Sequence, residues 1–167
     1  MVMIQQYPDA GQMPGTQRPA PPASVLSAVR VMYAGAVASV VLAIIYVMTM
    51  SATKTAIQKK NPHFSASTLS TVTHVGVIIG AVGALIGAVL FIWIARSCKS
   101  GKNWARVTAT VLAAVSVLGT LYDFVSAVAP AVRILNLVLL LIGLAAVTLL
   151  WLGSSNAYFS FFRRPQF

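Results

Sequence analysis

Four stretches of this sequence are each long and apolar enough to cross a lipid bilayer. A spanning helix needs about 20 mostly apolar residues, because each residue adds about 1.5 Å to a helix that must cross roughly 30 Å of hydrocarbon. Three of the stretches contain no charged residue, and the other contains only Arg106 near its start and Asp123 near its end. The sequence therefore predicts an integral membrane protein whose spans are residues 31–50, 75–95, 104–128 and 134–152.

Composition limits the chain to one membrane domain. Hydrophobic residues make up 58% of the sequence and charged residues only 8%, whereas soluble domains carry roughly 25% charged residues. We expect this domain to cover residues 24–160, between a tail at 1–23 and a basic, aromatic tail at 161–167. The first tail holds five prolines and few apolar residues, so it is expected to be disordered.

The first connection predicts two helices that project past the membrane. The first helix is expected to begin near Ser24, whose hydroxyl can cap free amides, and to remain helical as far as Lys60. Pro62 ends it, because the residue before a proline avoids the α region. The second helix is expected to begin early, near residues 65–67, in the polar run ahead of its span.

The other connections are short, with Gly101 in one and Pro130 in the other. Short links make consecutive helices antiparallel neighbours. The predicted fold is therefore an all-α, antiparallel four-helix transmembrane bundle.

Basic residues are distributed unequally between the two sides of the membrane. With four spans, the side of both termini carries eight lysines and arginines and the other side carries four. The richer side is normally cytoplasmic, and all three tryptophans fall at this same face. We therefore expect a multi-pass protein of the cell membrane, with both termini in the cytoplasm and its basic face against anionic lipid headgroups. Because the bases are scattered at the ends of spans, nucleic-acid binding is not expected. The eight are Arg18, Arg30, Arg96, Lys99, Lys102, Arg106, Arg163 and Arg164, and the four are Lys54, Lys59, Lys60 and Arg133.

Small residues form a stripe on each predicted span. On the second span four glycines are spaced four, three and four residues apart, which places them on one helix face. In lipid, such faces let helix backbones approach closely. We expect this stripe to pack against another helix, either of the same chain or of a second copy. The four are Gly76, Gly80, Gly83 and Gly87. Comparable small or polar stripes are Gly35 and Ser39; Ala109, Ala113, Ser116, Thr120 and Asp123; and Asn136 and Gly143.

Asp123 is the ionisable residue that the sequence places furthest inside the outer end of a span. It lies about five residues, or roughly 7 Å, from that end, and a carboxylate there is a candidate functional group. Two interpretations stay open. Either Asp123 forms a structural ion pair with Arg133 or with His74, or it carries protons or cations.

The sequence lacks a set of residues for catalysis. His63 and His74 do not have metal-site spacing, and Cys98 is the only cysteine. Cys98 lies among basic residues at a helix end, where a thiol can be reactive, acylated or without a role. We expect a protein that is not an enzyme and that uses no metal or cofactor.

Three short segments resemble a known group of proteins. They are Pro19–Gly35 (PAPPASVLSAVRVMYAG), Gly101–Leu112 (GKNWARVTATVL) and Leu149–Phe159 (LLWLGSSNAYF). They are similar to segments of small, uncharacterised four-helix integral membrane proteins of actinobacteria. The resemblance implies an inner-membrane location and a layout of four spans, and it carries no known activity or site residue.

Two functions from different classes follow from these observations. The first is a non-catalytic membrane component that associates with itself or with a membrane-protein partner through its small-residue stripes. The second is a small transporter or channel in which Asp123 lines a polar path.

Overall fold

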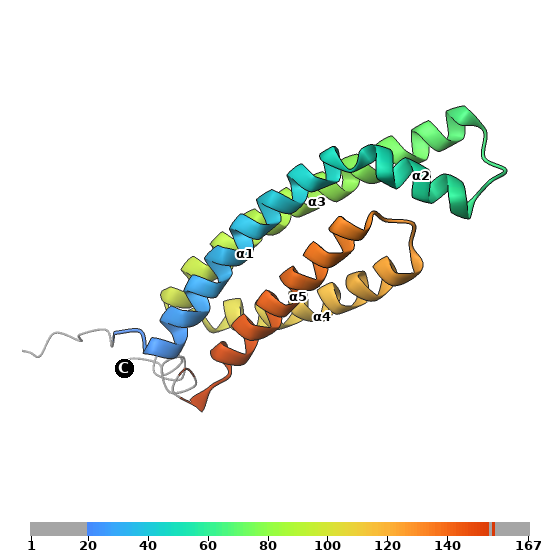
Figure 1. The fold of residues 1–167 in the computed structure, drawn as a ribbon. Coiled ribbons are helices and arrows are strands. Elements are labelled where there is room, and N and C mark those ends of the chain that lie inside the picture. Colours follow the sequence, from blue (N-terminus) through green and yellow to red (C-terminus); the bar gives the residue numbers. More distant parts are fainter. Residues whose placement is uncertain (1–19, 154, 156–167) are drawn as a thin grey trace, which may run out of the picture.

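The computed structural model describes residues 20–153 and residue 155, which form five helices (Figure 1). Residues 1–19 of the tail predicted at 1–23, and the C-terminal tail predicted at 161–167, lie outside the described residues. The helices are α1 (Ala23–Met48), α2 (Met50–Lys60), α3 (Ala66–Lys99), α4 (Asn103–Val125) and α5 (Pro130–Leu150). The predicted all-helical class is confirmed for the described residues.

The start of α1 differs from the prediction. Pro22 is the N-cap residue, and no side chain caps the helix. The Ser24 hydroxyl instead forms a 2.8 Å hydrogen bond with the hydroxyl of Ser155, beyond the end of α5. A serine in the first turn of a helix can form such a hydrogen bond when the end of another helix lies beside it.

The predicted pair of projecting helices is present, with one break. Thr49 interrupts the first helix, and its hydroxyl donates to the Ile45 carbonyl at 2.7 Å. After the turn that follows Asn61, α3 begins with Ser65 as its cap, since the Ser65 hydroxyl accepts a hydrogen bond from the Thr68 amide. Figure 1 shows this α2–α3 hairpin extending beyond the α4–α5 turn.

The helices on either side of the last connection have other bounds than the predicted apolar spans. Helix α4 ends at Val125 and not at residue 128, so Asp123 lies in its last turn. Helix α5 begins at Pro130 and not at Ile134. Proline is tolerated in the first turn of a helix because that turn needs no amide donor. Pro130 therefore belongs to α5, and the turn is formed by the residues before it.

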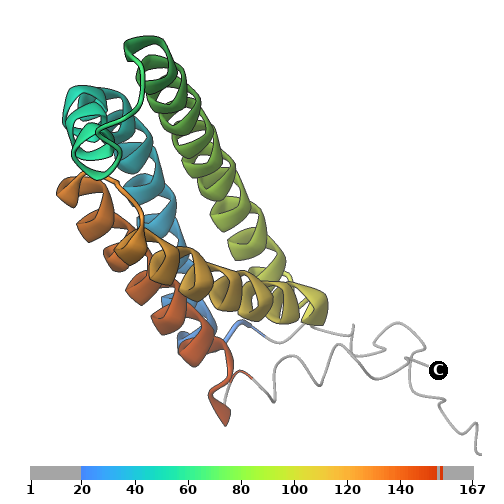
Figure 2. The ribbon, with the colours of Figure 1, turned by 90° about the vertical axis from the view of Figure 1, so that its right-hand side faces the viewer.

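Packing among the four long helices is uneven. Helix α1 packs along both α3 and α5, and α4 packs mainly against α5. Helices α3 and α4 contact each other far less, and in Figure 2 they diverge from the turn that joins them. Gly101 makes that turn with a φ of 75°, which favours glycine. The bundle is thus open along the side between α3 and α4.

The buried core has two parts. The larger cluster lies near the α3–α4 turn and includes Met32, Ile94, Cys98 and Leu150. The smaller lies near the opposite end and includes Leu42 and Val132. Between the two clusters, a groove between α3 and α4 reaches the interior of the bundle.

Large apolar side chains cover the outside of the described structure. Val37 and Leu118 are each 67% exposed, and Ile79 and Val89 are each 66% exposed. Helices α1, α3, α4 and α5 are each long and apolar enough to cross a membrane. The predicted number of spans is therefore confirmed at the level of length and composition.

Candidate functional site

A hollow of the described structure lies in the groove between α3 and α4. It is a cavity of about 410 Å³, which is within the range of ligand sites in proteins. Small residues of α3 and α4 form its walls, and α1 and α5 form its floor. The wall residues include Gly80, Gly83, Gly87, Ser116, Gly119 and Thr120, and the floor includes Ser39, Leu42, Tyr46, Asn136 and Leu139.

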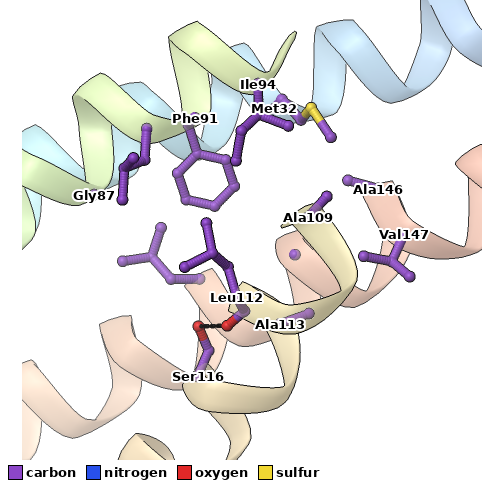
Figure 3. Close-up of a pocket in the computed structure, with 13 residues that line it drawn as sticks. Met32, Gly87, Phe91, Ile94, Ala109, Leu112, Ala113, Ser116, Ala146 and Val147 are labelled. Atoms are coloured by element: carbon purple, nitrogen blue, oxygen red, sulfur yellow. Dashed lines mark hydrogen bonds between the residues drawn. The ribbon is translucent and has the colours of Figure 1, made fainter. Parts of the chain in front are cut away.

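A smaller cavity of about 140 Å³ continues the groove toward the α3–α4 turn. In Figure 3, Gly87 and Phe91 of α3 face Leu112 and Ser116 of α4 across it. Met32 and Ile94 close its inner end. The two cavities share wall residues, so they are neighbouring parts of one groove; these residues are Gly87, Phe91, Ser116 and Leu139.

A polar cluster lies at the wide end of the groove. The Asn136 amide on α5 donates a 2.7 Å hydrogen bond to the Asp123 carboxylate on α4. The Tyr46 hydroxyl approaches Asn136 from α1. The Tyr46 ring in turn lies over Gly80 of α3, where an added Cβ atom would be 2.5 Å from it. These four residues therefore link all four long helices.

The two cations proposed as partners of Asp123 have other contacts. Arg133 donates to the Ser126 carbonyl at 3.3 Å, and its guanidinium lies 5.6 Å from the centre of the Phe124 ring. His74 contacts the Ser70 carbonyl at 2.8 Å and lines a different cavity, between α1, α2 and α3. Within the part of the chain that the structure describes, Asn136 is the hydrogen-bond partner of Asp123, and the structure brings neither Arg133 nor His74 to it.

The four glycines of the α3 stripe have different surroundings. Gly80 receives the Tyr46 ring, and a Cβ atom added at Gly87 would lie 3.8 Å from the Ser39 hydroxyl oxygen. A Cβ atom added at Gly76 or Gly83 would have no neighbour within 4 Å. The stripe therefore has one close contact, at Gly80, an ordinary van der Waals contact at Gly87, and open space at Gly76 and Gly83.

Tyr46 is the residue of the cluster that sequence reasoning missed. A signal was present, since Tyr46 lies seven residues after Ser39 and eleven after Gly35, on one face of α1. Asn136 was placed on the small and polar face of its helix, but its pairing with Asp123 depends on how α4 and α5 align.

The end of the bundle near the α3–α4 turn is aromatic and basic. The Arg106 guanidinium lies 3.7 Å from the centre of the Trp151 ring, and the Trp151 indole donates to Thr110 at 3.0 Å. The rings of Trp93 and Trp104 pack with their centres 5.2 Å apart and their planes tilted by 53°. Cys98 is fully buried in the core, so its thiol is closed to reagents in this conformation.

Asp123 is the acidic residue among those that line the groove. Among residues 20–153 and 155, no three histidine, cysteine, aspartate or glutamate side chains gather as a metal site would need. Comparison with known proteins adds nothing to this description, since no protein-family model, no curated protein and no solved structure matches the sequence.

Proposed function

We propose that this protein is a non-catalytic, multi-pass component of the cell membrane that binds a membrane-embedded partner in the groove between α3 and α4. In this proposal the four long helices form an antiparallel bundle with both termini in the cytoplasm. The exposed apolar surface of these helices and the excess of basic residues near the α3–α4 turn support it. The resemblance to small actinobacterial membrane proteins agrees with this location.

The observation that carries the proposal is the separation of α3 from α4. A bundle that served only as a scaffold would gain packing contacts by closing this side, because dispersion between helices drives their association in lipid. Glycine, alanine and serine form part of its lining, beside larger residues such as Phe91, Leu112 and Tyr122, and leave room for another molecule. An occupant would complete the packing of the bundle.

A photo-reactive side chain introduced in native membranes tests this function. Placed at Ser116, in the groove, it is expected to give one discrete adduct, either with a protein or with one class of lipid. Leu118 is the control, because it is 67% exposed and lines neither part of the groove. There we expect a mixture of bulk lipids. The same mixture at both positions would show that the groove has no specific partner.

A transporter is the second candidate function, and the polar cluster at Asp123 favours it. The inner part of the groove opposes it, because Met32, Phe91 and Ile94 offer a proton or cation no polar partner there. We expect proteoliposomes of the parent protein to show no proton or cation flux. A reproducible flux that disappears in Asp123→Asn at unchanged melting temperature would replace the binding function with transport.

A further inference from the structure

We propose that the groove binds an amphiphile with a single apolar chain and a cationic amine head. The head would lie at Asp123 and the chain would run along the groove toward Ala109. This inference rests on the proposed function, because it names the chemical class of the partner that the groove binds.

The assignment of the head depends on the charge at Asp123. The carboxylate is half-buried and faces the wider cavity. The Lys60 ammonium donates to the Val125 carbonyl, and Arg133 donates to the Ser126 carbonyl. Both nearby cations thus contact the backbone at the end of α4, and Asp123 receives only an amide hydrogen bond from the described residues. A carboxylate that faces a membrane-embedded groove is stabilised by a paired cation, which an amine head would supply.

The assignment of the chain depends on how the groove changes along α4. Asp123 and Ala109 are 14 residues apart on this helix, which corresponds to about 21 Å. Polar residues line the end near Asp123, whereas the lining near Ala109 is apolar and includes Phe91, Ile94 and Leu112. One polar end and one apolar end match the two parts of an amphiphile.

The shape of the groove favours a chain over a helix. The apolar part of the groove is the smaller cavity, about 140 Å³ against about 410 Å³ at the polar end. Figure 2 shows α3 and α4 converging toward the turn that joins them. A helix with side chains is about 10 Å across and would have to separate α3 from α4 there. An alkyl chain can occupy the narrow part without moving either helix.

Three probes with the same chain and different heads test the inference. Dodecylamine, dodecanol and dodecanoate are titrated into the full-length protein in a neutral detergent, and native mass spectrometry measures the bound fraction. We expect one dodecylamine molecule to bind per protein molecule. It should bind about tenfold more tightly than dodecanol, because a hydrogen bond to a charged group is stronger than a neutral one. Dodecanoate should bind most weakly. Equal affinity for dodecylamine and dodecanol would overturn the cationic head.

Asp123→Asn tests the head separately. It should reduce the affinity for dodecylamine to that for dodecanol and leave dodecanol binding unchanged. A tenfold preference for the amine that survives in this variant would overturn the role of Asp123.

Matched glycine substitutions test the position of the chain. Gly83→Leu fills the groove and should lower the affinity for dodecylamine and dodecanol together. Gly76→Leu is the control, since Gly76 lies on the same helix, outside the groove lining, and also has open space beside it. If Gly83→Leu is not folded by its melting curve, Ser116→Leu takes its place. Equal affinities in the filled and control variants would overturn this position.

The photo-reactive side chain at Ser116 separates this inference from the proposed function. An adduct with a helix of a second copy, or of another membrane protein, would retain the proposed function and overturn the amphiphile. An adduct with one amine-headed, single-chain lipid supports both. The bulk-lipid mixture at Ser116 as well as at Leu118 would overturn both.

Discussion

Gly80 and Gly83 lie three positions apart on the same face of α3, but a side chain would meet different surroundings at each. An added Cβ atom at Gly80 would be 2.5 Å from Cε1 of Tyr46, and at Gly83 nothing lies within 4 Å. The Tyr46 ring has restricted freedom to move away, because its hydroxyl approaches Asn136. A side chain should therefore be tolerated at Gly83 and not at Gly80.

We expect Gly80→Ala to destabilise the protein by about 1–3 kcal/mol, the usual effect of adding atoms to a packed site. Gly83→Ala should be neutral, or stabilising by up to about 1 kcal/mol, because alanine favours helix over glycine. Unfolding in mixed micelles measures both changes in free energy. Equal effects of the two substitutions would contradict the close contact between Gly80 and Tyr46.

The sequence predicts residues of the site better than it predicts their pairing. Asp123 and the glycines were identified because an acid inside a span and a periodic stripe are visible in one helix. The partner of Asp123 was not identified. Asn136 and Arg133 both lie on the first turns of α5, and only the rotation of that helix about its axis determines which of the two faces Asp123. Its rotation depends on packing against α1 and α4, which no local pattern encodes.

At the scale of elements, the end of α4 depends on residues from other helices. Its last turn contains no basic residue, although cations stabilise the carbonyls that a helix leaves unpaired there. Two cations from other helices take this role. Lys60 of α2 donates to the Val125 carbonyl, and Arg133 of α5 donates to the Ser126 carbonyl. The hairpin is thereby connected to the other half of the bundle.

Lys60→Ala should therefore loosen the last turn of α4. We expect amide hydrogens there to exchange faster, by the equivalent of about 0.3–1 kcal/mol, since the cation at the helix end is lost. Hydrogen–deuterium exchange with mass spectrometry measures this on peptides that cover residues 118–126. Lys59→Ala is the matched control, as Lys59 is the exposed neighbour on the same helix. Identical exchange in the two variants would show that the Lys60 contact has no role.

Helix boundaries were predictable where the chain itself encodes a stop. Ser65 and Gly101 mark a start and a turn, as expected from a cap and from a positive φ. The break at Thr49 and the divergence of α4 from α3 have no such signal. The sequence therefore predicted four spans but not the groove between two of them.

For the whole molecule, the testable property is its orientation in the membrane. Alkaline phosphatase is active only outside the cytoplasm, so a fusion after Asn61 should be active and one after Gly101 should be inactive. The excess of basic residues on the side of the α3–α4 turn is the physical reason. The opposite pattern of activity would reverse the proposed orientation, and activity at both positions would contradict the four spans.

The length of α3 affects which part of the protein is accessible from the water beside the membrane. The residues from Ala66 to His74 precede the apolar part of the helix and add about 13 Å beyond it, whereas the headgroup layer is about 5–8 Å thick on each side. In the proposed orientation the tip of the α2–α3 hairpin therefore stands clear of the lipid, above the α4–α5 turn (Figure 1). In that orientation an antibody or a protease outside the cell would contact this tip before any other described part of the chain. The tip is therefore the expected epitope on intact cells.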